Sequence, residues 1–260
     1  MLCNLETLTG YTLQATDGEI GRCKDFLFDD NSWAIRWMVA DTHKWLPLGR
    51  KVLISPVSLG AHFSENKTIP VNLNRQTIED SPHLDEHSPV SRTQERKLFE
   101  HFGYGYYWAG AGIWGAYPYP SPLMEPRVEL DNDDGTAAAD DSEDSHLRSF
   151  NEVKGYTVHA ADGDIGHVDD IVIDRDDWKI TFIIVDTHNW LPGGRKVVIA
   201  SDFLGDVSWS EQHVMVNLNV AQIENSPLYV PDRLNDVDYQ NILYEYYRFQ
   251  RNWNDLKRHA

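Results

Sequence analysis

The sequence predicts a mainly β protein built from two copies of one domain. Shifted by 145 residues, Gly10–Trp108 matches Gly155–Trp253 without a gap, with 36 of 99 paired positions identical, where roughly six would be expected from composition. Short strand-like segments separated by turn residues fill both copies. Each copy is long enough to close its own core, so the chain is not a solenoid. We expect domains over 1–108 and 151–260, joined by a linker over 109–150.

Each copy should open with a β-hairpin. Asp17-Gly18 and Asp162-Gly163 are Asp-Gly pairs, which tolerate the positive φ of a tight turn. We therefore expect Gly163 to have a positive φ and to resist replacement by valine. A strand with alternating apolar residues follows and ends at an acidic turn in both copies.

A third strand begins at Trp33 or Trp178 and is almost wholly apolar in the second copy, where it reads ITFIIVDT. Such a run is typical of a strand buried on both faces, and we expect it to be the central strand. The repeated block DTHxWLPxGRKVxI comes next. Its prolines, Pro47 and Pro192, should interrupt the extended chain before RKVLI or RKVVI forms another strand.

Short helices should close each copy after a last strand in TIPVNLN or HVMVNLN. Asn74 and Asn219 are suitable N-caps for a first helix, which a Ser-Pro pair ends. A second, aromatic helix is expected over roughly 92–102 and 237–249, because its apolar residues recur four positions apart on one face. Ser91 and Gln94 fit a capping box.

The segment 109–150 has the composition of a linker. It is first rich in Gly, Ala, Tyr and Pro and then acidic, with eight Asp or Glu and no Lys or Arg from Glu129 to Asp144. So little apolar material cannot offset the entropy lost on ordering. The sequence predicts a mobile tether.

Composition excludes several classes of function. The formal net charge is −18 at pH 7, and no Lys/Arg run exceeds two residues, which argues against direct binding of nucleic acid or anionic membranes. No apolar run is long enough to cross a bilayer, and the N-terminus does not resemble a signal peptide. The two cysteines, Cys3 and Cys23, lie only in the first copy and suggest neither a disulfide framework nor a repeated metal site. A reducing cytoplasm fits best.

The motif G-Y-x-(L/V)-x-A-x-D-G-(E/D)-I-G-x-x-x-D, followed by an apolar strand and WLPxGRKVxI, resembles the PRC-barrel family. That family is named after the cytoplasmic domain of the photosynthetic reaction-centre H subunit, and a related barrel ends a ribosome maturation factor. The resemblance covers roughly three quarters of the chain. It implies two tandem PRC-type β-barrels, each a small, strongly bent barrel with short C-terminal helices, that serve as an adaptor module. We expect the two to pack as a pseudo-two-fold pair.

Asp41-Thr42-His43 and Asp186-Thr187-His188 are the repeated residues that most suggest catalysis. An Asp beside a His occurs in metal sites and general bases. The simpler interpretation is a turn at a strand end, in which Asp accepts backbone N–H groups and His is partly exposed. We favour the turn, since one His per copy is too few for a metal and no nucleophile accompanies it. We therefore expect no catalytic residue, metal or cofactor.

Six residues of the second repeated block are candidates for binding a partner: Trp45, Arg50, Lys51, Trp190, Arg195 and Lys196. The basic pairs stand out in an acidic chain and could bind a partner's carboxylates or phosphates. Their arginines could instead pair with the chain's own Asp25, Asp29 or Asp41, or with the equivalent carboxylates of the second copy, which we favour. The two tryptophans are equally suited to a core and to an interface.

Three functions remain open at this stage. A non-enzymatic cytoplasmic adaptor that binds another protein, or itself as a homo-oligomer, is our leading hypothesis. A peripheral accessory factor of a photosynthetic or other electron-transfer membrane complex rests on the family resemblance alone. A metal-dependent hydrolase using His43 and His188 would need ligands that the sequence does not identify.

Overall fold

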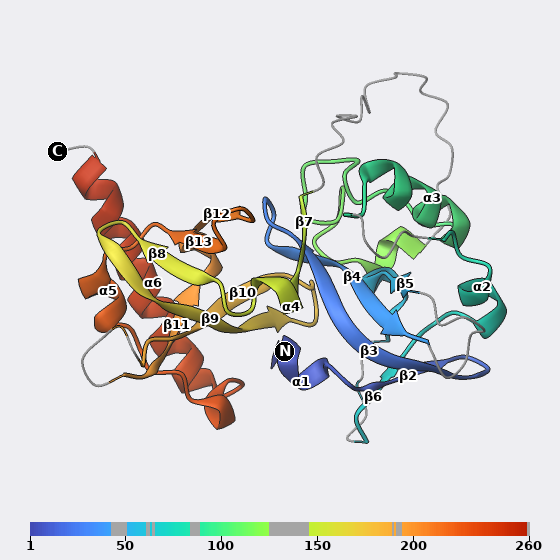
Figure 1. Cartoon of the computed structure of the whole chain (residues 1–260), viewed down its shortest axis with the longest axis horizontal. Coiled ribbons are helices and arrows are strands. Elements are labelled where there is room, and N and C mark those ends of the chain that lie inside the picture. Colours follow the sequence, from blue (N-terminus) through green and yellow to red (C-terminus); the bar gives the residue numbers. More distant parts are fainter. Residues whose placement is uncertain are drawn as a thin grey trace. The chain divides into compact units, whose positions relative to one another are not determined.

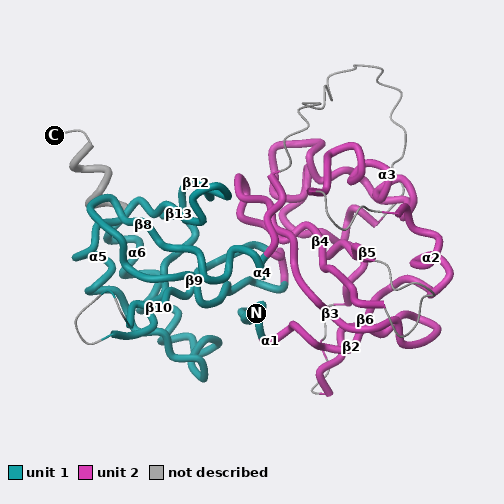
Figure 2. Tube along the Cα trace, viewed as in Figure 1, with its two compact units in different colours: residues 1–6, 150–175, 179–260 teal, residues 7–149, 176–178 magenta. Residues whose placement is uncertain are grey.

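The computed structural model describes residues 1–42, 51–60, 63, 66–83, 89–124, 146–188, 190 and 194–258, the last eight of these by backbone alone. The chain divides into two compact units (Figure 2). Unit 1 consists of Met1–Glu6, Phe150–Arg175 and Lys179–Ala260. Unit 2 consists of Thr7–Ser149 and Asp176–Trp178. Each unit is mainly β, as expected.

Unit 2 contains a six-stranded sheet in the order β5-β4-β3-β2-β6, with β7 also paired to β3. Its strands are β2 (Thr12–Ala15), β3 (Gly18–Asp29), β4 (Ala34–Asp41), β5 (Lys51–Ile54), β6 (Thr68–Pro70) and β7 (Leu147–Ser149). Its helices are η1 (Pro56–Ser58), α2 (Arg75–Glu79), α3 (Arg92–Phe102) and η2 (Ser121–Met124). The sheet is antiparallel except for the β2/β6 pair, which is parallel.

Unit 1 repeats this arrangement in a seven-stranded sheet of order β11-β10-β9-β8-β13-β12, with β1 also paired to β9 (Figure 1). Its strands are β1 (Leu2–Asn4), β8 (Thr157–Ala160), β9 (Gly163–Asp174), β10 (Ile180–Asp186), β11 (Lys196–Ala200), β12 (Leu204–Ser208) and β13 (His213–Val216). Its helices are α4 (Phe150–Val153), η3 (Ser201–Phe203), α5 (Val220–Glu224), η4 (Pro231–Arg233) and α6 (Val237–Arg258), while α1 (Leu5–Leu8) runs from unit 1 into unit 2. Again one strand pair, β8/β13, is parallel.

The predicted hairpins and helix starts are confirmed. Strands β2/β3 and β8/β9 form antiparallel hairpins. Asn74 and Asn219 cap α2 and α5 through their side chains, and Ser91 with Gln94 forms the expected capping box of α3. Helix α6 continues to Arg258, beyond the predicted end near residue 249.

The prediction of the central strand was wrong. Strands β4 and β10 are buried along most of their length, as the apolar sequence of the second copy predicted. However, β3 and β9 each pair with three other strands and therefore occupy the middle of their sheets. Both run for 12 residues, with register shifts in their pairing that bend the ladder. The sequence did not reveal the central position of β9, because apolar and polar residues alternate along its first half and such alternation is typical of a strand with one exposed face.

The hairpin glycine of the second copy also differs from expectation. The two turn residues are Ala161 and Asp162, because Ala160 pairs with Gly163 across the hairpin. Gly163 is absent from the described residues with positive φ, so the predicted reason for a glycine there was wrong. Asp162 has a different role, since its Oδ1 accepts the Val220 amide at 2.7 Å and so satisfies a free N–H at the start of α5.

The first strand of each copy pairs with the long strand of the other copy. Strand β1 places Leu2 opposite Asp174 of β9, and β7 places Leu147 opposite Asp29 of β3. A shift of 145 residues converts one pairing into the other, so the repeat reaches Leu2. The compact units differ from the predicted ranges 1–108 and 151–260 by this exchange, and also because unit 2 includes residues 109–149 and Asp176–Trp178.

Partly buried hydrogen bonds hold both exchanged strands in place. Asn4 Nδ2 donates to Asp170 Oδ2 at 2.8 Å in unit 1, and Ser149 Oγ donates to Asp25 Oδ2 at 2.6 Å in unit 2. Asp25 and Asp170 are equivalent in the repeat, as are Asn4 and Ser149. Burial raises the pKa of Asp170, although the hydrogen bond from Asn4 opposes this. The repeated aspartate thus serves as an acceptor for the incoming strand.

Residues 109–124 are part of unit 2, although their composition predicted a linker. Trp114 is fully buried, and its Nε1 donates to the Asp177 carbonyl at 2.6 Å. Leu123, in η2, is also buried. The acidic stretch Glu129–Asp144 lies outside the described residues, and β7 and α4 begin within the last residues of the predicted linker, 146–150.

A buried polar cluster attaches the chain that follows α3 to that helix and to the sheet. Glu95 accepts hydrogen bonds from Trp37 Nε1 and Arg92 Nη1, both at 2.8 Å, and from Tyr107 Oη at 2.9 Å. Burial raises the pKa of Glu95, and the charge of Arg92 only partly offsets that effect. The guanidinium of Arg36 lies 3.9 Å from the ring centroid of Tyr107. The cluster is therefore structural, with every contact directed into unit 2.

Candidate functional site

The second Asp-Thr-His sequence forms a turn at the end of β10. Asp186 Oδ1 accepts the His188 amide at 2.9 Å, while the Thr187 hydroxyl donates to the Arg195 carbonyl at 2.7 Å. The Thr187 amide donates to the same carbonyl at 3.0 Å, and Trp190 donates its amide to the Thr187 carbonyl at 3.0 Å. Thr187 is buried, whereas His188 is exposed. These contacts agree with the turn interpretation and close the loop between β10 and β11.

Trp190 projects from this turn onto the surface of unit 1. Its side chain is 39% exposed, which identifies it as a surface residue and not a core one. Its ring meets His167 edge to face, with centroids 5.6 Å apart, and Nε1 lies 3.4 Å from His167 Nε2. A tryptophan held in one orientation and half covered is the kind of residue that anchors a protein interface.

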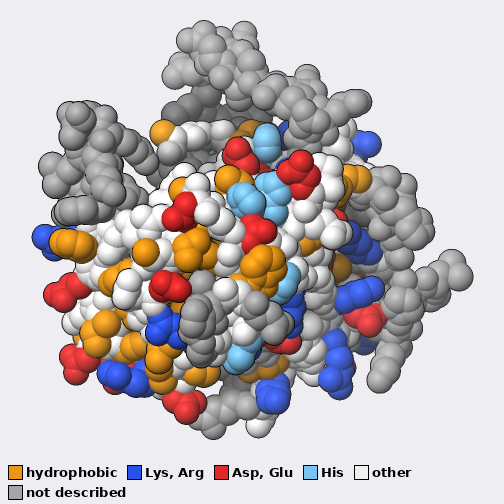
Figure 3. All heavy atoms as spheres, turned by 60° about the vertical axis from the view of Figure 1, so that its left-hand side comes forward, with side chains coloured by type: hydrophobic (Ala, Val, Ile, Leu, Met, Phe, Trp, Pro, Cys, Tyr) orange, Lys and Arg blue, Asp and Glu red, His pale blue; other side chains and the backbone are white. Residues whose placement is uncertain are grey.

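Trp190 borders a groove of about 480 Å³ in unit 1. The other polar residues of its wall are Asn151 in α4, Lys154 just after it, His167 and Asp169 on β9, Asp186 at the end of β10, and His188 in the turn. Figure 3 draws one face of the molecule, on which hydrophobic side chains lie among histidine, acidic and basic ones. The groove therefore has one large apolar anchor and a charged rim.

Two charged residues of this rim, Asp169 and Lys154, form ion pairs with residues beside the groove. Lys196 Nζ lies 2.7 Å from Asp169 Oδ2, and Lys154 Nζ lies 2.6 Å from Glu6 Oε1. The hydrogen bond to Asp169 raises the pKa of Lys196. Slight burial works against ionisation of Asp186, but the hydrogen bonds from His188 outweigh it and lower the pKa of that carboxyl. Both charges therefore persist through the neutral range.

Of the residues in the basic pairs, Lys196 forms an ion pair with Asp169. The expected pairing of Arg50 and Arg195 with the chain's own aspartates stays a prediction. Arg195 supplies backbone groups to Thr187. In the first copy, Lys51 lies in β5 opposite Asp41, while His43, Trp45 and Arg50 lie outside the described residues.

Sequence reasoning missed three titratable residues of the groove: Lys154, His167 and Asp169. His167 pairs with Asp186 across the β9/β10 ladder, and Asp169 lies two residues further along β9, where the register of that ladder shifts. Knowledge of the strand register would have found His167, whereas such an irregularity is not encoded by simple alternation. The counterparts of these two β9 residues in the first copy are Arg22 and Lys24, so a search for repeated residues could not detect them.

Two chemical possibilities receive no support from the described residues. Among them, no group of three or more His, Cys, Asp or Glu side chains is placed to hold a metal ion. Both cysteines are free thiols, and burial raises the pKa of Cys3 to about 12 and that of Cys23 further. Neither is a thiolate nucleophile at neutral pH.

Strands β8 to β13, with the β8/β9 hairpin and the Asp-Thr-His turn, lie in one continuous segment of the second copy. Residues 146–222 match the family model of the PRC-barrel domain. PRC-barrel domains serve in protein–protein interaction and assembly. No curated protein matches the chain. No helix in the described part of the chain combines the length and apolar character needed to cross a membrane.

The matched segment runs from the start of β7 into α5. It therefore includes β7, the strand that pairs with β3 of the first copy. The groove beside Trp190 lies almost entirely within this domain. The first copy lies outside the matched segment and is similar to it only through the internal repeat. The 36 identities of that repeat include the Asp-Gly and Asp-Thr-His blocks.

Proposed function

We propose that this chain is a non-enzymatic cytoplasmic adaptor or assembly protein that binds another protein through its PRC-barrel domain. The observation that carries the proposal is the exposed, oriented ring of Trp190 at the edge of a groove with a mixed charged rim. Large aromatic side chains surrounded by polar groups supply most of the binding energy in protein interfaces. Closed barrels in both copies, packed as a pseudo-two-fold pair, stay a prediction.

Trp190→Ala is expected to abolish capture of the partner, because removal of a central aromatic anchor typically weakens an interface by about 2 kcal/mol or more, or roughly 30-fold. The measurement is affinity capture from native lysate with quantitative mass spectrometry, followed by calorimetry on the identified pair. Trp209→Ala is the matched control, since Trp209 is 41% exposed in the same unit but does not border the groove. Equal recovery of the partner by both variants would contradict the proposal.

We also propose that the Asp-Thr-His turns are not an active site. His188 is engaged by Asp186 within its own turn, and its ring is exposed. Replacement of His43 and His188 by asparagine together is expected to leave metal content at background, measured by plasma mass spectrometry, and partner binding largely intact. Stoichiometric zinc or iron in the native protein that disappears in the double variant would instead support a metal-dependent hydrolase.

A further inference from the structure

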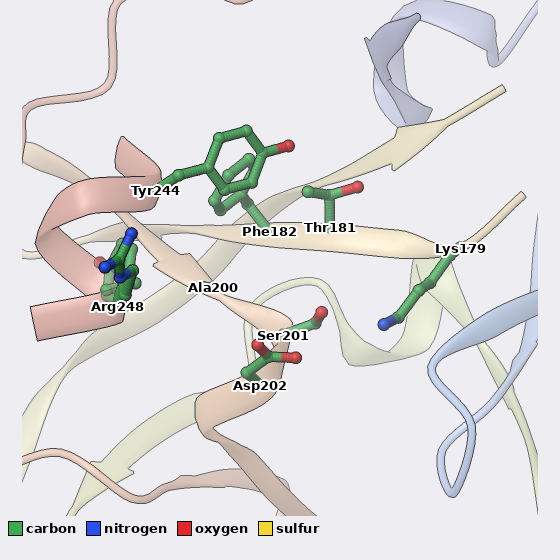
Figure 4. Close-up of a pocket in the computed structure, with 9 residues that line it drawn as sticks. Lys179, Thr181, Phe182, Ala200, Ser201, Asp202, Tyr244 and Arg248 are labelled. Carbon is green, nitrogen blue, oxygen red and sulfur yellow. The ribbon is translucent and has the colours of Figure 1, made fainter. Parts of the chain in front are cut away.

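A second groove in unit 1 lies between α6 and the strands β10 and β11. Its volume is about 380 Å³. The residues that matter for the argument are Lys179, Thr181, Phe182, Asp202, Tyr244 and Arg248, and Figure 4 shows them around the groove. The rings of Phe182 and Tyr244 lie 5.8 Å apart, and Tyr244 is 48% exposed. The groove thus presents aromatic surface to solvent.

The internal repeat shows what covers the equivalent surface in unit 2. Tyr244, Phe182 and Asp202 correspond to Phe99, Trp37 and Val57 of the first copy. All three counterparts are buried, Phe99 and Trp37 completely. The helix face is therefore covered in unit 2 and partly open in unit 1, where Tyr244 and Asp202 are exposed, whereas Phe182 is buried as its counterpart Trp37 is.

The cover in unit 2 is the chain that follows α3. The Phe99 ring contacts the rings of Tyr104, Tyr106, Tyr107 and Trp108, with centroid distances from 5.4 to 6.3 Å. Further along, η2 packs on η1, and Trp114 is fully buried. The covering segment, residues 104–124, is rich in Tyr, Trp, Gly and Pro and contains no charged side chain.

The second copy cannot form this cover from its equivalent residues. Helix α3 ends at Gly103, whose φ of 72° allows the chain to turn back over the sheet. The equivalent residue in α6 is Arg248, and the helix continues through it to Arg258. Among the described residues of unit 1, none occupies the position that residues 104–124 take in unit 2.

We propose that this groove binds an aromatic peptide segment of a partner protein, similar in composition to residues 104–124 and neutral or acidic in charge. The exposed ring of Tyr244, which lies against the buried ring of Phe182, supplies the apolar surface equivalent to that of Phe99, which residues 104–124 cover in unit 2. The rim carries Lys179 and Arg248 against Asp202, where the first copy has Ala34, Gly103 and Val57, so a basic peptide is disfavoured. The groove is separate from the one beside Trp190, and each proposal can fail without the other.

The probe is a fluorescent synthetic peptide with the sequence of residues 103–124, added to the full chain and followed by fluorescence polarisation. We expect saturable binding that Tyr244→Ala weakens at least tenfold. Tyr244→Phe, which restores the residue of the first copy, is expected to retain binding. Ile242→Ala is the control, because Ile242 is 50% exposed on the same helix and does not border the groove. A peptide in which the tryptophans are replaced by alanine should bind more weakly than the parent.

Two results would overturn this proposal. The first is no saturable binding, or equal affinity for the native protein and Tyr244→Ala while circular dichroism shows both folded. The second is a dimer in sedimentation velocity that Tyr244→Ala dissociates, since the groove would then be covered by a second copy of the chain. Loss of partner capture by Trp190→Ala has no bearing on either result.

Discussion

Gly166→Ala is expected to lower the free energy of unfolding of unit 1 by about 3 kcal/mol or more. Gly166 has a φ of 148°, which L-residues rarely adopt. A Cβ atom at this position would lie 2.1 Å from the carbonyl oxygen of Asp186, where β9 passes the end of β10. That obstacle is backbone and cannot rotate away, so the strands would have to separate. Denaturant unfolding followed by circular dichroism measures the loss.

Gly163→Ala is the matched control on the same strand. Gly163 does not have a positive φ, and the nearest atom to an added Cβ is a methyl group of Val220 at 3.7 Å. Its effect is expected to stay within about 1 kcal/mol. Gly21 is the equivalent of Gly166 in unit 2, with Asp41 O only 2.0 Å from the added Cβ, and should behave as Gly166 does. Similar losses for Gly163 and Gly166 would show that the close approach does not determine stability.

Features set by local sequence could be predicted, and features set by pairing between distant segments could not. The N-caps Asn74 and Ser91 act on amides within three residues, so their helices begin where the sequence indicates. The exchanged strand β1, by contrast, has three residues and pairs with a partner about 170 residues away. Nothing in so short a segment encodes its partner, and its identity to β7 is limited to Leu2 and Leu147.

The candidate site was predictable to a similar extent. Trp190 and Lys196 were identified because they belong to a block repeated almost unchanged. The carboxylate that Lys196 contacts, Asp169, lies on β9 and has a lysine as its counterpart in the first copy. Internal repetition therefore identifies the framework that both copies share. It cannot identify residues that distinguish the second copy, and these include most of the groove.

Residues 109–124 show why composition alone was misleading. Glycine and proline are frequent in linkers, but here they direct two bulky apolar residues, Trp114 and Leu123, into buried positions. A tethered segment needs only a few such anchors to become ordered, because each removes a large apolar area from water. Counting residue types hides the anchors among the small residues around them.

Trp114→Ala is therefore expected to destabilise unit 2 by about 3–5 kcal/mol, the usual cost of truncating a buried tryptophan. The change would remove the hydrogen bond to the Asp177 carbonyl and the ring that lies 4.9 Å from the guanidinium of Arg36. Arg36 is itself buried, so it would lose part of its shielding. Thermal and denaturant unfolding of the full chain measure the effect, with Tyr117→Ala as the control because Tyr117 is 42% exposed in the same segment. If Trp114→Ala unfolds at the same denaturant concentration as Tyr117→Ala, residues 109–124 contribute no more to stability than a linker would, as their composition first suggested.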